Sequence, residues 1–131
     1  MSRLSLDDLR QFTGDLERFV HPLNRRVLYT PGVRYLAETG GAYWLIDAIA
    51  AWLGSPKLTA EMQADERLQS LQFWKLDVHS DQSATLICQA DTGEPEVIRQ
   101  QIPWTDFPLP NVQIWVGFDG RHWVLYLPSK H

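Results

Sequence analysis

The sequence predicts an α+β fold in which N-terminal helices pack on one face of a roughly five-stranded antiparallel meander sheet. Apolar residues recur at helical spacing through the first half of the chain and alternate with polar residues from Leu71 onward. Two hairpin-type turns, residues 91–93 (DTG) and 119–120 (DG), separate alternating segments of the second half. Because strands joined by such turns pair antiparallel, the second half is expected to form a meander.

Length and bulk composition limit the class of protein. The 131 residues fit one domain, 1–131, and the net charge of −4 argues against nucleic acid as a partner. The single cysteine, Cys88, provides no disulfide framework, so we expect a cytoplasmic location. Asp7 and Asp8 argue against an export signal, and the longest apolar run, 42–53, is too short to span a membrane.

Capping residues place the beginning of the chain. Ser5 and Asp8 form a variant of the capping box, which predicts a short helix that ends at Gly14. The stretch 16–29 has apolar residues at no clean period. It is therefore interpreted as one or two short extended pieces.

Three further helices are expected before residue 71. Residues 30–32 (TPG) predict a type II turn, and a short helix follows it and ends at residues 40–41 (GG). The helix over 42–53 has the clearest pattern, and its apolar stripe, which should face the sheet, consists of Leu45, Ile46, Ile49, Trp52 and Leu53. A more polar fourth helix is expected to begin at Thr59 and to run to about residue 70.

Five strands are expected in the second half, over residues 71–78, 84–90, 97–102, 112–118 and 123–127. A proline-rich loop, 103–110, precedes the fourth strand and cannot itself be a central strand. Alternation assigns Trp74, Leu86 and Ile114 to the face that meets the helices. The opposite face, called the outer face below, then carries Phe73, Ile87 and Trp115.

Several segments resemble a known bacterial family. They are YWLID (43–47) and QIPWTDFPL (101–109), with further similar segments at 9–14, 29–33 and 127–129. On these residues the chain resembles domain of unknown function 6876 over nearly its whole length. The resemblance implies no activity, because that family has no assigned chemistry. It does imply an accessory role, since members are similar to proteins carried on plasmids and other mobile elements.

Asp47 interrupts the most apolar helix beside Tyr43 and Trp44, and these three residues form one candidate binding site. Three interpretations stay open: a solvent-facing carboxylate, a site acid, and a structural pair with Arg25, Arg26, Arg34 or His21. Because charged groups are seldom buried without a partner, the exposed and structural interpretations are favoured. We expect Asp47 to be partly covered and bonded to a group from the first 35 residues.

A second candidate binding site is the run Trp104, Thr105, Asp106 and Phe107 within the proline-rich loop. Thr and Asp in loops usually shape the turn through local hydrogen bonds. Loops also carry function more often than strands do, and two aromatic residues bracket this pair. Turn-shaping and ligand binding are therefore both open.

No catalytic or metal motif is present. His79-Ser80-Asp81 are consecutive, whereas the members of a catalytic triad come from distant positions. The histidines and Cys88 have no metal-ligand spacing, so neither a metal nor a cofactor is expected. The favoured function is a small binding or protein-interaction module. The alternative is a hydrolase-type enzyme that uses Asp47 and Asp106 with a histidine.

The outer face is the candidate interface. Phe73, Ile87 and Trp115 lie on neighbouring predicted strands, and either Trp123 or Tyr126 joins them, depending on the register of the last strand. A contiguous apolar patch on a monomer usually marks an interface, and a two-fold copy is the commonest way to cover it. We therefore expect a homodimer, or a partner protein in the same place.

Overall fold

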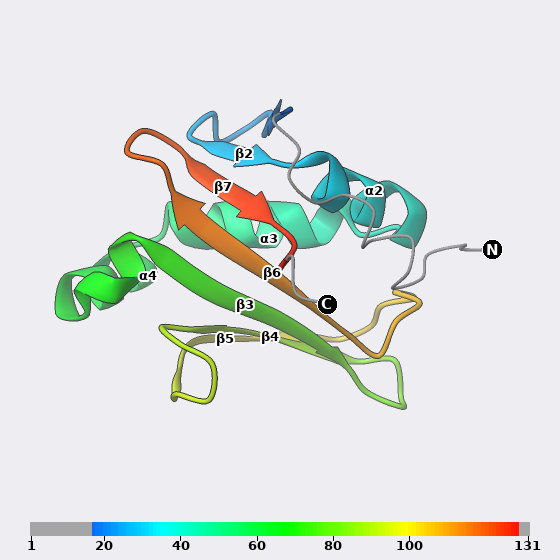
Figure 1. The fold of residues 1–131 in the computed structure, drawn as a ribbon. Helices are drawn as coiled ribbons and strands as arrows, with labels where there is room; N and C mark the ends of the chain where they lie inside the picture. The colour runs from blue at the N-terminus through cyan, green and yellow to red at the C-terminus, as the bar shows by residue number, and fades with distance from the viewer. Residues whose placement is uncertain (1–16, 129–131) are drawn as a thin grey trace.

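The computed structural model describes residues 17–128, which form a mixed α/β fold with three α-helices and a seven-stranded sheet (Figure 1). The helices are α2 (Pro31–Gly40), α3 (Tyr43–Leu53) and α4 (Pro56–Ala64), followed by the 3₁₀-helix η1 (Glu66–Gln69). The strands are β1 (Phe19–Val20), β2 (Val27–Tyr29), β3 (Leu71–Val78), β4 (Ala84–Gln89), β5 (Glu96–Ile102), β6 (Asn111–Phe118) and β7 (Trp123–Tyr126). The helix predicted from Ser5 to Gly14 lies outside the described residues.

The strand order is β1-β2-β7-β6-β3-β4-β5, and every neighbouring pair is antiparallel except β2 with β7, which is parallel. The prediction of a five-stranded antiparallel meander is therefore wrong. The two short extended pieces near the N-terminus are strands of the same sheet, and they extend it beyond β7.

The proline-rich loop causes the departure from a meander. β3, β4 and β5 follow one another through short turns, but β6 pairs with β3 and not with β5. Residues 103–110 carry the chain from the end of β5 to the far side of β3, where Val78 N donates to Pro110 O at 2.8 Å. A two-residue turn forces its flanking strands to pair, whereas a loop of this length leaves the partner to tertiary packing.

The expected type II turn at residues 30–32 is also wrong, because helix α2 begins there. Thr30 is the N-cap, and its side-chain oxygen accepts a hydrogen bond from Val33 N at 3.4 Å. Pro31 occupies the first turn, where a missing N–H costs nothing. Gly41, with φ of 63°, ends the helix in the left-handed conformation that favours glycine.

The fourth helix begins earlier and ends sooner than expected. Ser55 caps α4 by accepting from Leu58 N at 3.2 Å, and Pro56 follows in the first turn. Thr59, the predicted cap, instead donates its hydroxyl to Ser55 O at 2.8 Å. The polar stretch to residue 70 is divided into α4 and η1.

Burial follows the predicted alternation along the central strands. Residues of the helices and of alternate strand positions belong to one hydrophobic core, which includes Leu36, Leu45, Ile46, Ile49, Trp74, Leu76, Leu86, Ile114 and Val116. Trp52 is half-buried, and its indole Nε1 donates to Gln100 Oε1 of β5 at 2.7 Å. In Figure 1, α3 lies behind β6 and β7.

Candidate functional site

The outer face of the sheet carries a row of three aromatic rings. Phe73 of β3 lies opposite Trp115 of β6, and Trp115 lies opposite Tyr126 of β7. The ring centroids are 5.0 Å and 6.2 Å apart, and both contacts are edge-to-face, which aromatic pairs prefer. All three side chains are half-buried. The register thus places Tyr126, and not Trp123, on this face.

Ile87, the remaining candidate interface residue, lies beside the aromatic row. It pairs with Lys75, which shares the outer face with Phe73 because the two are separated by two positions on β3. The three predicted interface residues are therefore on one face and on three adjacent strands. Thr85 also faces outward but is buried. Its hydroxyl lies 2.8 Å from His79 Nε2 and 3.2 Å from Gln101 Oε1.

Open hollows flank the aromatic row. One of about 460 Å³ lies beside Leu71 and Phe73, and one of about 240 Å³ lies between Phe73 and Ile87. A third, of about 370 Å³, lies beside Tyr126 over Gly117. The row is thus a ridge with depressions on either side, a relief into which another surface can interlock.

The centre of the row contains an unsatisfied donor. The indole Nε1 of Trp115 is buried and has no hydrogen-bond partner among the described residues. A buried donor without an acceptor costs about 1–3 kcal/mol. Phe at this position would fill the row without that cost, so fold stability alone does not account for Trp115.

Charges of both signs surround the ridge. Lys75 and Asp77 form an ion pair at 3.7 Å on the outer face itself. Arg67 and Asp91 line the largest of these hollows, and Arg18 with Asp119 lines the one beside Tyr126. The rim has no single sign of charge, which suits a protein surface better than a polyanion.

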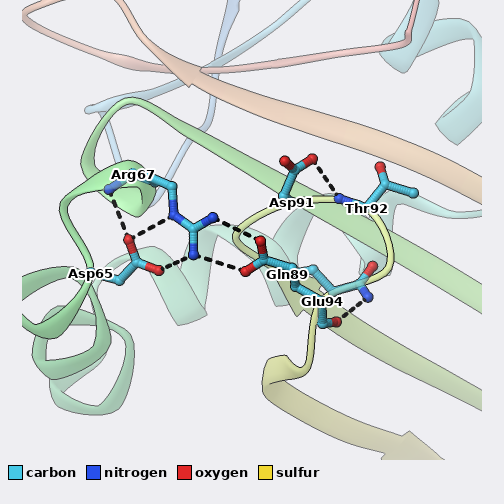
Figure 2. A network of polar contacts seen from close by, with 6 residues as sticks. All are labelled: Asp65, Arg67, Gln89, Asp91, Thr92 and Glu94. Carbon is cyan, nitrogen blue, oxygen red and sulfur yellow. Dashed lines mark hydrogen bonds and ion pairs between the residues drawn. The ribbon is translucent and has the colours of Figure 1, made fainter.

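A charge network fixes one border of this face (Figure 2). The guanidinium of Arg67 in η1 donates two hydrogen bonds to Glu94 at 2.8 Å each, and others to Asp65 at 2.7 and 3.1 Å. The hairpin turn is held in addition by Gln89 Nε2, which donates to Glu94 O at 2.6 Å, and by Thr92 N, which donates to Asp91. This network could not be predicted from the sequence, because the charged partners in η1 and the turn are 27 positions apart.

The network shifts the ionisation of its members. Hydrogen bonds from Arg67 hold the pKa of Asp65 and that of Glu94 below their ordinary values. The bonds to Asp65 and then to Glu94 raise the pKa of Arg67. The carboxylates are therefore stabilised in their charged forms, although their exposure to solvent screens the interaction.

Acidification is expected to weaken this network. Because both carboxyl groups have a lower pKa when folded, the unfolded chain binds more protons, and the stabilisation is complete above the unfolded values of about 4. It is lost as the pH falls through the lower folded values. Arg67→Met should therefore flatten the decline of the urea midpoint between about pH 5 and pH 2.

Arg99→Met provides the matched control, since Arg99 is another exposed arginine, bonded to Glu96 at 2.6 Å. The pKa values of Asp81 and Asp119 are also lowered, by Ser83 and by backbone N–H groups, respectively. Those contributions stay in both variants. An equal pH dependence in wild type and Arg67→Met would contradict the role given to Arg67.

Asp47 is bonded to a histidine of the N-terminal segment, one of the partners proposed from the sequence. His21 Nε2 lies 2.8 Å from Asp47 Oδ1, and His21 Nδ1 accepts from the backbone N–H groups of Leu23 and Asn24 at 3.2 and 3.0 Å. Because Nδ1 is the acceptor, a ring hydrogen on Nε2 satisfies all of these contacts. His21 is buried, whereas the Asp47 side chain is 64% exposed. The carboxylate is thus less covered than expected.

None of the hollows described above is lined by Tyr43, Trp44 or Asp47. Tyr43 is exposed and interacts with Arg34 and Glu38, while desolvation and then the charge of Glu38 raise its pKa. Trp44 is half-buried against the core. The three residues share one helix but have separate surroundings.

The loop site divides into anchors and exposed groups. Thr105 is buried, its N–H donates to Gln82 O at 2.8 Å, and its hydroxyl oxygen accepts from Phe107 N at 3.1 Å. Phe107 is buried in the core. Trp104 is 60% exposed and Asp106 is also exposed. Thr105 and Phe107 therefore shape and anchor the loop, and Trp104 and Asp106 are its accessible side chains.

The groups suggested for a hydrolase are separated in the same way. Asp47 contacts His21, whose second ring nitrogen is occupied by backbone donors, and Asp106 lines none of the hollows described above. Burial raises the pKa of the Cys88 thiol to about 12, so this cysteine is not an activated nucleophile.

Within residues 17–128, no group of three His, Cys, Asp or Glu side chains is placed to hold a metal ion. No helix of that part of the chain is long and apolar enough to cross a bilayer.

Comparison with known proteins gives one match. Residues 3–131 match the model of a family described as "Family of unknown function (DUF6876)". No curated protein and no solved structure matches the chain. The resemblance drawn from the YWLID and QIPWTDFPL segments is confirmed, and it covers nearly the whole sequence.

Proposed function

Since this chain belongs to the family of unknown function DUF6876, we propose from its own surface that it is a protein-interaction module whose outer sheet face binds a second copy of the chain. The observation that carries the proposal is the half-buried row of Phe73, Trp115 and Tyr126 with hollows beside it. Aromatic residues in such positions are typical of interaction hot spots. Helix α3 lies behind the sheet in Figure 1, which leaves the outer face open to a partner.

The dimensions of the face agree with a reversible dimer. β3 and β6 are eight residues long, and with β4 and β7 they form a four-strand surface. At about 4.8 Å between strands and about 3.4 Å per residue, this surface covers roughly 400 Å² in projection. A standard interface buries about 800 Å² per partner. Residues around the four strands must therefore contribute to the contact area, and we expect the dimer to dissociate at micromolar concentrations.

The outer faces of two copies of the chain have complementary charges. Lys75 and Asp77 are neighbours on β3, so a two-fold axis passing near them lets each lysine approach the aspartate of the other copy. The hollows that contain Arg67 with Asp91 and Arg18 with Asp119 repeat this mixture of signs. A two-fold partner therefore meets no large field of like charge.

Self-association is tested by light scattering and by cross-linking. Gln113→Cys places an exposed thiol beside Trp115, while the native Cys88 is buried and unreactive. This variant should form a disulfide-linked dimer under mild oxidation. Trp115→Lys, combined with Gln113→Cys, should prevent the cross-link and reduce the scattering mass to that of a monomer.

The matched control is Gln63→Cys, an exposed glutamine of α4 that lines none of the hollows described above, and it should not cross-link. Ile87→Lys serves as a second disrupting variant if Trp115→Lys does not fold. A monomer at millimolar concentration, without a Gln113→Cys cross-link, would rule out a second copy and leave another protein as the occupant.

The cytoplasmic location and the accessory role on a mobile element are part of the same proposal.

A further inference from the structure

One end of the sheet carries the most exposed aromatic side chain on the described strands and their loops. Trp104 is 60% exposed, whereas the aromatic residues of the outer face are half-buried. It lies in the loop 103–110, which meets the β3–β4 turn, 79–83, at the right-hand end of the sheet in Figure 1. This end is separate from the aromatic row proposed as the dimer interface.

The platform under Trp104 is rigid. Thr105 N donates to Gln82 O at 2.8 Å, and Val78 N donates to Pro110 O at 2.8 Å, so the loop is bonded both to the β3–β4 turn and to the end of β3. Phe107 anchors it in the core, and prolines restrict the backbone at positions 103, 108 and 110. An indole held in solvent on such a base loses little entropy when it binds.

Carboxylates dominate the charge of this end. Loops 79–83 and 103–110 contain Asp81 and Asp106 and no lysine or arginine, and the histidine of the turn, His79, lies 2.8 Å from the Thr85 hydroxyl. Hydrogen bonds from Ser83 lower the pKa of Asp81, so its carboxylate is charged at neutral pH. Among residues 17–128, no cation–π contact involves Trp104. An exposed indole beside carboxylates suits a guanidinium or an ammonium group, which combines ring stacking with charge pairing.

We propose that this end of the sheet is a second binding site, for a basic segment of a partner protein. Trp104 stacks against an arginine or lysine side chain of that segment, and Asp106 pairs with its charge. Thr105 and Phe107 hold the loop in the binding conformation without touching the partner. The site is independent of self-association through the outer face.

A titration of the ¹⁵N-labelled protein with a capped peptide of alternating arginine and glycine tests this site. The indole N–H signal of Trp104, assigned through Trp104→Phe, and the amide signals of loop 103–110 should shift and saturate. Trp104→Ala should weaken binding by about tenfold. Asp106→Asn should weaken it by a smaller factor and should reduce its dependence on salt.

Three controls separate this site from general attraction to a chain of net charge −4. Tyr43→Ala removes another exposed aromatic residue and should bind as wild type does. A peptide of alternating glutamate and glycine should not bind, and Trp115→Lys should retain the site even if it prevents dimers. Shifts spread over the whole surface, or equal binding by wild type and Trp104→Ala, would overturn the proposal.

Discussion

Replacing Trp74 with Ala is expected to lower the free energy of unfolding by about 3–5 kcal/mol. Trp74 is 1% exposed and is the largest of the fully buried side chains. It lies on β3, between β4 and β6 in the middle of the sheet. Truncation removes apolar burial and leaves a cavity that surrounding strands cannot close, because their backbones are held by the sheet.

The indole also completes a buried polar chain. Trp74 Nε1 donates to Gln72 Oε1 at 3.0 Å, and Gln72 Nε2 donates to Leu68 O at 3.0 Å. Gln72 is fully buried, so losing the indole leaves its carbonyl without a described donor. Trp74→Phe should therefore cost less than Trp74→Ala and still clearly more than zero.

Urea denaturation followed by circular dichroism measures both variants. Trp104→Ala is the matched control, because it deletes an indole that is 60% exposed, and its midpoint should stay close to that of wild type. A Trp74→Ala midpoint indistinguishable from that of Trp104→Ala would contradict the central position assigned to Trp74.

Replacing His21 with Ala is expected to cost about 2–3 kcal/mol. The ring is buried and accepts hydrogen bonds from Leu23 N and Asn24 N while Nε2 contacts Asp47. These bonds shape the turn that ends where His21 N donates to Val27 O at 2.9 Å and β2 begins. The loss therefore reaches the sheet itself, where β2 pairs with β7.

Asp47→Asn separates the roles of the two partners. The carboxylate is 64% exposed, and an amide oxygen can accept the same hydrogen bond, so the expected loss is below about 0.5 kcal/mol. Hydrogen exchange at Thr30, whose N–H donates to Leu125 O, reports on the pairing of β2 with β7 directly. If Asp47→Asn destabilised the protein as much as His21→Ala, the carboxylate and not the turn would be the important element.

The candidate sites were predicted from sequence to different degrees. Alternation placed Phe73, Ile87 and Trp115 on one face, because the side-chain period of a strand depends only on the local backbone. The sequence also pointed to residues 104–107 as a candidate site, but it did not show which of these side chains anchor the loop and which are accessible. Only the fold determines that Thr105 and Phe107 are buried while Trp104 and Asp106 are exposed.

The sequence by itself determined the central helix, the long strands and the faces that these strands turn to the core. The apolar stripe of 43–53, the inward positions of β3, β4 and β6, and the glycine turns at Gly93 and Gly120, which have φ of 86° and 97°, all follow from patterns within a few residues. The tertiary structure alone decided the order of the strands, the parallel pairing of β2 with β7 and the Arg67–Glu94 contact. These features join positions far apart in the chain, where periodicity and turn chemistry carry no information about which segments meet. There the choice depends on which arrangement buries the shared core and satisfies the backbone hydrogen bonds together.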